Sequence, residues 1–136
     1  MCFFSKLREL KILLIDDDKW IRDSLSLFFE SEGIFLVACE TAEEGLETLR
    51  DQTYDIIIVD YKLPGMDGLE FLKRVKESHP GSMKVLLTAY KEDKVVAETN
   101  RIGVDDFIEK PFTAKTIEES LSRLIEKQEQ KISGLL

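Results

Sequence analysis

The most informative stretch of this sequence is Ile-Ile-Ile-Val-Asp-Tyr-Lys-Leu-Pro-Gly-Met-Asp-Gly, residues 56–68. It opens with four consecutive β-branched residues, which suit a strand buried on both faces of a parallel sheet. Asp60 follows directly, and the pair Pro64-Gly65 then predicts a turn. We therefore expect a buried strand that delivers a carboxylate to its carboxyl end.

Similar short apolar runs recur along the chain, separated by stretches whose apolar residues repeat with the period of a helix. The predicted strands are Lys11–Ile15, Phe35–Ala38, Asp55–Val59, Lys84–Leu87 and Val104–Ile108. The predicted helices carry the apolar sets Ile21/Leu25/Phe28, Ala42/Leu46/Leu49, Leu69/Leu72/Val75, Val95/Val96/Ile102 and Ile117/Leu121/Leu124. This alternation predicts an α/β fold, a doubly wound five-stranded parallel sheet with five helices on its two faces.

The composition of the chain excludes several classes of function. The chain has 136 residues and a net charge of −8, so we expect one domain that does not bind nucleic acid directly. Its apolar runs are too short to cross a bilayer, and its N-terminus lacks the order of a signal peptide. Cys2 and Cys39 have no metal-like spacing. We therefore expect both cysteines to be free thiols in a reducing compartment, which makes the cytoplasm the expected location.

Polar residues follow several predicted strands, where ligands of such sheets bind. They are Asp16, Asp17 and Asp18 after the first strand, Asp60 after the third, Thr88 and Ala89 after the fourth, and Lys110 with Pro111 after the fifth. Clustered carboxylates repel one another, and an all-oxygen site suits Mg²⁺ or Ca²⁺. Mg²⁺ pairs well with phosphate oxygens, so we expect a phosphoryl donor as the substrate.

Each polar group can then be given a task. An aspartate can act as the nucleophile and form an acyl phosphate without an adjacent base, because it is already ionised at neutral pH. Lys110 can pair with a phosphoryl oxygen and the Thr88 hydroxyl can donate to another, while the small Ala89 leaves room for the donor. We expect Asp16 and Asp17 to bind the metal, whereas Asp18 is expected to cap the first predicted helix.

Four segments together resemble the response-regulator receiver domains of two-component signalling. They are Ile-Leu-Leu-Ile-Asp-Asp-Asp (12–18), the opening stretch (56–68), Leu-Leu-Thr-Ala-Tyr (86–90) and Gly-Val-Asp-Asp-Phe-Ile-Glu-Lys-Pro-Phe (103–112). The resemblance implies a receiver domain over residues 10–127, an N-terminal extension over 1–9, and a C-terminal helical extension or tail over 128–136. It also implies the flavodoxin-like strand order 2-1-3-4-5.

The resemblance assigns roles to individual residues. It makes Asp60 the phosphoacceptor, and it implies that Asp16, Asp17, Asp60 and the Lys62 backbone carbonyl hold Mg²⁺. It implies that the Ala89 backbone contacts the phosphoryl group, that Thr88 and Phe107 form the switch, and that Lys110 precedes a cis proline, Pro111. Lys62 and Tyr90 occupy positions that tune hydrolysis in this family.

The same resemblance implies how the domain works. A histidine kinase or phosphotransfer protein donates the phosphoryl group, and the domain catalyses only its own phosphorylation and autodephosphorylation, so we do not expect an enzyme in the ordinary sense. Phosphorylation then remodels the face made by the helix near Val95–Ile102, the strand Val104–Ile108 and the helix near Ile117–Leu124. The recipient of the signal is a downstream protein or an output domain outside this chain, and phosphorylation-dependent homodimerisation stays open.

Two other functions are considered. A phosphatase of the haloacid dehalogenase type also uses an aspartyl phosphate, and Asp16-x-Asp18 imitates its nucleophile motif. That family has an acidic pair after its lysine, whereas Asp105-Asp106 here precedes Lys110. The other alternative is a degenerate receiver that acts only as a docking module.

Overall fold

The computed structural model describes residues 3–89 and 93–134, and Cys2 and Tyr90 lie outside this part of the chain. The strands are β1 (Lys11–Ile15), β2 (Phe35–Cys39), β3 (Ile56–Asp60), β4 (Met83–Thr88) and β5 (Asp106–Glu109). The helices are α1 (Phe3–Leu7), α2 (Lys19–Ser31), α3 (Ala42–Asp51), α4 (Gly68–Ser78), α5 (Asp93–Ile102) and α6 (Ala114–Gly134).

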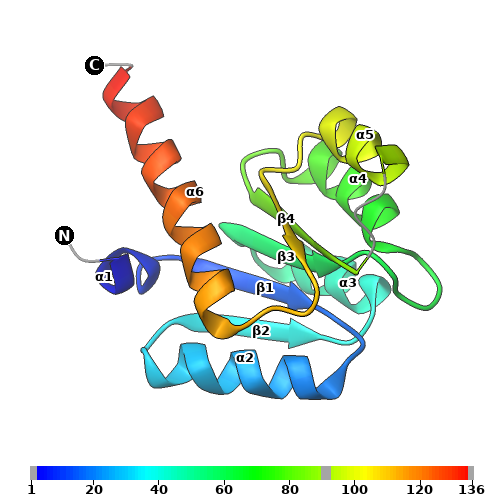
Figure 1. Ribbon diagram of the computed structural model, residues 1–136, viewed down its shortest axis with the longest axis horizontal. Coiled ribbons are helices and arrows are strands. Elements are labelled where there is room, and N and C mark those ends of the chain that lie inside the picture. Colours follow the sequence, from blue (N-terminus) through cyan, green and yellow to red (C-terminus); the bar gives the residue numbers. More distant parts are fainter. Residues whose placement is uncertain (1–2, 90–92, 135–136) are drawn as a thin grey trace.

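The strands form one parallel sheet in the order β2-β1-β3-β4-β5 (Figure 1), which confirms the predicted fold class. The register aligns the carboxyl ends of the strands: Ile15 pairs with Val59, Asp60 with Leu87, and Thr88 with Glu109. Polar residues that are far apart in the sequence therefore reach the same edge.

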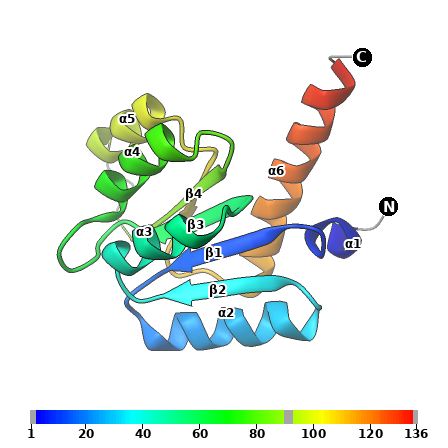
Figure 2. The ribbon, with the colours of Figure 1, turned by 180° about the vertical axis from the view of Figure 1, so that it is seen from behind.

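Helices cover both faces of the sheet. The core on one face joins alternate strand residues to α3, α4 and α5, and the core on the other joins the remaining strand residues to α2 and α6. Every residue of β3 is buried, so the apolar run that predicted this strand belongs to the centre of the sheet. The view from behind shows the same division, with α6 continuing past the sheet (Figure 2).

One helix was not predicted. α1 lies in the segment interpreted as an N-terminal extension, and its Leu7 is fully buried in the core beside α2 and α6. Phe4 meets Phe28 of α2 edge-on, with ring centroids 6.5 Å apart. An apolar pair and a leucine one turn later were the available sequence signal for this helix.

The strand boundaries differ slightly from the prediction. β3 includes Asp60, and β5 begins at Asp106, two residues after the predicted start. Gly103 adopts a φ of 82°, and the Asp105 carboxylate accepts a hydrogen bond from the Lys84 backbone N–H at 2.7 Å. The connection therefore turns through residues 103–105 before strand pairing begins. Within the part of the chain that the structure describes, no helix is both long and apolar enough to span a bilayer.

Candidate functional site

An acidic group lies at the carboxyl edge of the central strands. Asp60 ends β3 and is 5% exposed, while Asp16 directly follows β1 and is fully buried. Asp17 is exposed next to them. Each of the three residues offers a carboxylate oxygen, and these oxygens all lie within 4.8 Å of one another.

Backbone contacts fix Asp16 in this position. Its N–H donates to the Cys39 carbonyl at 3.1 Å, continuing the pairing of β1 with β2. Its Oδ1 accepts from the Asp18 N–H at 2.9 Å, and its carbonyl accepts from Arg22 Nη1 at 2.9 Å. The other carboxylate oxygen, Oδ2, accepts from Lys110 Nζ at 3.1 Å.

Lys110 joins the two buried carboxylates. Its Nζ lies 3.1 Å from Asp16 Oδ2 and 3.1 Å from Asp60 Oδ2. The Lys110 backbone N–H donates to the Thr88 carbonyl at 2.7 Å, and the Lys110–Pro111 peptide bond is cis. The end of β5 therefore brings an ammonium to the rim that β1 and β3 supply with carboxylates.

Burial and charge set the protonation of this group. Burial raises the pKa of the Asp60 carboxyl to about 6, and the neighbouring Asp16 adds to that rise. Burial also raises the pKa of Asp16, against the opposing effects of the Asp18 amide and of Lys110. For Lys110, burial alone would lower the pKa, but Asp16 and Asp60 raise it above its ordinary value. The carboxylates outnumber the ammonium, so a cation fits the charge balance of this site.

Asp18 has the capping role that the sequence predicted. Its Oδ1 accepts hydrogen bonds from the Trp20 N–H at 2.8 Å and the Ile21 N–H at 3.3 Å, and it is the N-cap residue of α2. These two hydrogen bonds satisfy backbone amides in the first turn of α2, which have no carbonyl partner within the helix. Asp18 is therefore engaged at the start of α2 and is not one of the three residues of the acidic group.

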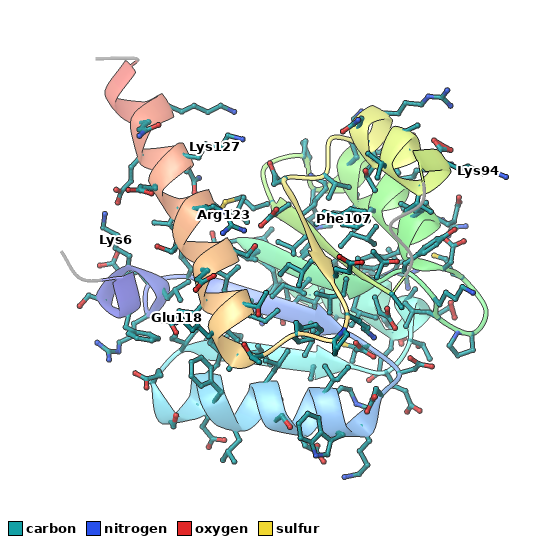
Figure 3. The ribbon with its side chains drawn as sticks, in the orientation of Figure 1. Lys6, Lys94, Phe107, Glu118, Arg123 and Lys127 are labelled. Carbon is teal, nitrogen blue, oxygen red and sulfur yellow. The ribbon has the colours of Figure 1, made fainter. Side chains whose placement is uncertain are left out.

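The other predicted residues surround the acidic group. Thr88 ends β4 and is 1% exposed, Ala89 follows it on the surface, and Lys62 is exposed in the loop after β3. Phe107 on β5 is half-buried against the core that includes Leu86 (Figure 3). The last two strands therefore provide a buried hydroxyl near the rim and an aromatic ring on the adjacent strand.

Two residues that support the site were missed by the sequence analysis. A Cβ built on Gly68 would lie 2.3 Å from the Asp60 carbonyl oxygen, so only glycine fits where α4 begins against the end of β3. Glu43 Oε1 of α3 accepts from the Met66 N–H at 3.2 Å and so holds the loop after Asp60. Both contacts join segments distant in sequence, and local patterns give no signal for them.

A cavity of about 650 Å³ adjoins Lys110 and Pro111. Trp20, 76% exposed on α2, lines it together with apolar residues of the segment before α6. It lies beside the acidic group and opens a mostly apolar surface next to the rim.

Comparisons with known proteins agree with this geometry. The profile of the response regulator receiver domain matches residues 12–122. Sporulation initiation phosphotransferase F of Bacillus subtilis is 30% identical over 115 residues, covering 85% of this chain and 93% of that protein. The transcriptional regulatory protein AfsQ1 of Streptomyces coelicolor is 32% identical over 120 residues, which is 88% of this chain but only 53% of that protein.

Solved structures give the same result. A CheY-like response regulator receiver domain protein from Methanospirillum hungatei superposes with a TM-score of 0.83 at 32% identity, covering 90% of this chain and 98% of that one. The chain spans about half of AfsQ1 and about a quarter of two longer regulators, FleR and NtrC. The similarity is therefore to the receiver part of those longer proteins.

Proposed function

Because this chain belongs to the response regulator receiver domain family, we propose that it accepts a phosphoryl group on Asp60 and thereby switches a protein-interaction surface. The observation that carries the proposal is the position of Lys110 Nζ, 3.1 Å from both Asp16 and Asp60 on a rim that also holds Asp17. This arrangement provides a nucleophilic carboxylate, further carboxylates for a metal, and a cation for the incoming charge.

Mg²⁺ fits the donor set. Asp16, Asp17 and Asp60 supply carboxylate oxygens, and the Lys62 backbone carbonyl is proposed as a further ligand. When bound, the ion would neutralise negative charge on the phosphoryl oxygens and the carboxylates. The raised pKa values of Asp16 and Asp60 are consistent with a site that is incomplete without a cation.

The chain's own residues would carry the transfer. A carboxylate oxygen of Asp60 forms a P–O bond while the P–N bond of a phosphohistidine donor breaks. Lys110 is already paired with Asp60 and can keep its ammonium on a phosphoryl oxygen as the carboxylate charge is replaced. The Thr88 hydroxyl and the Ala89 backbone N–H are proposed as donors to the remaining oxygens. A histidine kinase or phosphotransfer protein is the proposed donor.

The same residues connect the site to the output surface. Phe107 is paired in register with Leu86, two residues before Thr88 on β4. We propose that a shift of the Thr88 hydroxyl toward the phosphoryl group is coupled to an inward movement of Phe107. Inward movement of Phe107 would then alter the face made by α5, β5 and α6. The proposed recipients are a downstream protein or an output domain, and a second phosphorylated copy is a further candidate.

Acetyl phosphate labelling tests the acceptor. The protein is incubated with acetyl phosphate, with and without Mg²⁺, and its intact mass is compared with that of Asp60→Asn. We expect a gain of one phosphoryl group that requires Mg²⁺ and is absent in the variant. Labelling that persists in the variant would place the acceptor elsewhere.

Rapid autodephosphorylation could remove the label before the mass is measured. A beryllofluoride titration followed through Trp20 fluorescence tests for that case. Trp20 is the single tryptophan and lines the cavity next to Lys110, so a Mg²⁺-dependent change is expected there. Silence in both experiments would favour a docking-only module. Multiple turnover of a phosphomonoester would favour a phosphatase, although Asp18, the second acid of the imitated motif, is engaged as a helix cap.

A further inference from the structure

The loop between β3 and α4, residues 61–67, is closed at its base by backbone hydrogen bonds. The Tyr61 N–H donates to the Leu87 carbonyl at 2.8 Å, and the Gly68 N–H donates to the Tyr61 carbonyl at 2.8 Å. Lys62, whose carbonyl is the proposed further ligand of Mg²⁺, follows directly on this base. What orients the rest of the loop therefore bears on the proposed metal site.

Glu43, in the first turn of α3, meets the tip of this loop. Its Oε1 accepts from the Met66 N–H at 3.2 Å. The preceding Gly65 has a φ of 77°, and a Cβ built there would lie 3.2 Å from Glu43 Oε2 and 3.4 Å from Oε1. The carboxylate therefore lies close against the Gly65–Met66 peptide, where the missing side chain of glycine leaves it room.

Apolar packing also holds the loop, but it acts in a different way. Leu63 is buried in the core on the α3, α4 and α5 face, and Met66 packs against that core. Such contacts fix how deeply a side chain lies, because apolar attraction has no preferred direction. A hydrogen bond does depend on direction, so the contact with Glu43 fixes the orientation of a peptide group.

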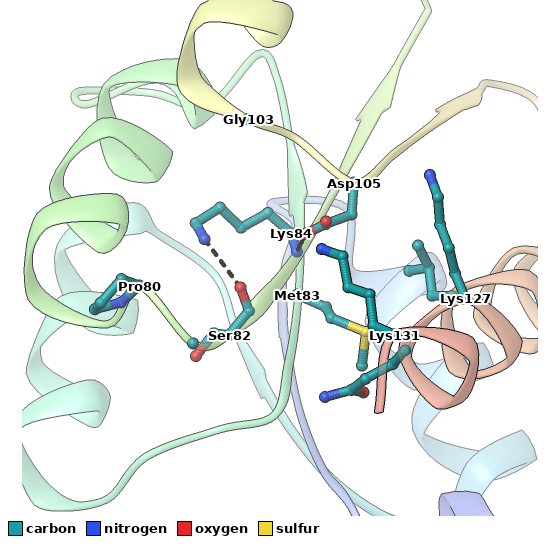
Figure 4. Close-up of a pocket in the computed structure, with 11 residues that line it drawn as sticks. Pro80, Ser82, Met83, Lys84, Gly103, Asp105, Lys127 and Lys131 are labelled. Carbon is teal, nitrogen blue, oxygen red and sulfur yellow. Dashed lines mark hydrogen bonds between the residues drawn. The ribbon is translucent and has the colours of Figure 1, made fainter. Parts of the chain in front are cut away.

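The turns around the cavity at the other end of β4 are fixed by nearer neighbours (Figure 4). The Lys84 N–H donates to Asp105 Oδ2 at 2.7 Å, and Lys84 Nζ donates to the Ser82 carbonyl at 2.9 Å. These contacts join β4 to the residues that directly precede β4 and β5. The loop after Asp60 instead receives a side chain from α3, a helix on another part of the chain. A substitution on α3 can therefore affect this loop without changing a residue of the acidic group.

We propose that Glu43 is a positioning residue for the metal site, a role that rests on the proposed function. By holding the Gly65–Met66 peptide it restricts the orientations of the loop that carries the Lys62 carbonyl. Mg²⁺ requires near-ideal octahedral geometry with ligands at about 2.1 Å, so a loop with more freedom offers that carbonyl less often. Groups that orient metal ligands typically change affinity by about 10- to 100-fold. Glu43 contacts the loop rather than the ligand itself, and we expect a smaller effect.

The test compares Glu43→Ala, Glu43→Gln and the wild type by two NMR measurements on backbone amides. One is a Mg²⁺ titration, and the other is hydrogen exchange in EDTA. Glu43→Ala should raise the Mg²⁺ dissociation constant by about three- to tenfold and speed exchange of the Met66 amide. Glu43→Gln keeps an acceptor oxygen, so both quantities should stay within about twofold of the wild type. Glu47→Ala is the matched control, because Glu47 is an exposed acid one turn later on α3.

Three outcomes would overturn the proposal. They are unchanged Mg²⁺ affinity in Glu43→Ala, an equal loss in Glu43→Ala and Glu43→Gln, or an equal loss in Glu47→Ala. The last two would trace the effect to the negative charge of α3 and not to the hydrogen bond. Glu43 is exposed, so we expect its variants to fold. Neither measurement uses a phosphoryl donor, and both therefore decide the role of Glu43 separately from the acetyl phosphate labelling that tests Asp60.

Discussion

Replacing Asp60 by asparagine should stabilise the protein in the absence of metal. The change keeps the size of the side chain but removes one of the negative charges that the rim holds together. Burial and Asp16 raise the pKa of Asp60 from 3.8 to about 6, a rise of about two units. At about 1.4 kcal/mol per unit, this corresponds to an upper limit of about 3 kcal/mol.

The realised gain should be smaller than this limit. The Asp60 side chain retains some exposure at the rim, and the variant leaves Lys110 with Asp16 as its remaining partner. We therefore expect Asp60→Asn to raise the free energy of unfolding by about 1–2 kcal/mol at neutral pH.

The gain should depend on pH in a defined direction. Below pH 3.8 the Asp60 carboxyl is protonated in both the folded and unfolded states, so it carries no penalty there. Between pH 3.8 and about 6 the unfolded chain ionises Asp60 while the folded state still holds its proton, so stability falls as the pH rises, and the loss is complete above about 6. Wild-type stability therefore falls relative to the variant over this interval, and the advantage of Asp60→Asn grows.

Urea unfolding in EDTA at pH about 4 and about 7.5 measures this difference. Glu126→Gln is the control, because Glu126 is an exposed carboxylate on α6. Adding Mg²⁺ at ten times its dissociation constant should restore about 1.4 kcal/mol to the wild type and less to the variant. An advantage that is equal at both pH values, or a destabilised variant, would refute the reasoning.

Three further predictions concern the scaffold. Gly68→Ala should lower the free energy of unfolding by about 1–3 kcal/mol and slow acetyl phosphate labelling, because the added Cβ would meet the last backbone carbonyl of β3. Gly81→Ala is the control, since a Cβ there would have no atom within 4 Å, and equal labelling rates in the two variants would contradict the prediction. Leu7→Ala should lower the free energy of unfolding, measured in urea, by about 2–4 kcal/mol because Leu7 is fully buried. Leu27→Ala is the control, because Leu27 is 70% exposed and its loss should change stability little. Equal effects of the two substitutions would show that α1 does not contribute to the core. Asp18→Ala should lower the free energy of unfolding by about 1 kcal/mol through loss of the α2 cap. Its Mg²⁺ affinity, measured by titration, should stay within about twofold of the wild type, and a large loss of affinity would instead make Asp18 a metal ligand.

The sheet, the helices other than α1 and the order of the polar residues could be predicted from the sequence alone. A run of β-branched residues such as 56–59 is a local pattern, and its burial follows from having no polar face to expose. Asp16, Asp60, Thr88 and Lys110 could be placed on one edge before the structure was known, since parallel strands align their carboxyl ends. The capping role of Asp18 was equally local.

Contacts between segments that are distant in the sequence could not be predicted and depend on the tertiary structure. Three contacts depend on how the helices pack on the sheet. They are the close approach of Gly68 to the Asp60 carbonyl, the hydrogen bond of Glu43 to the loop after β3, and the burial of Leu7. Local patterns record which face of an element is apolar, but not which residue of another element lies against it, and that choice sets the distances, burial and charge of each site.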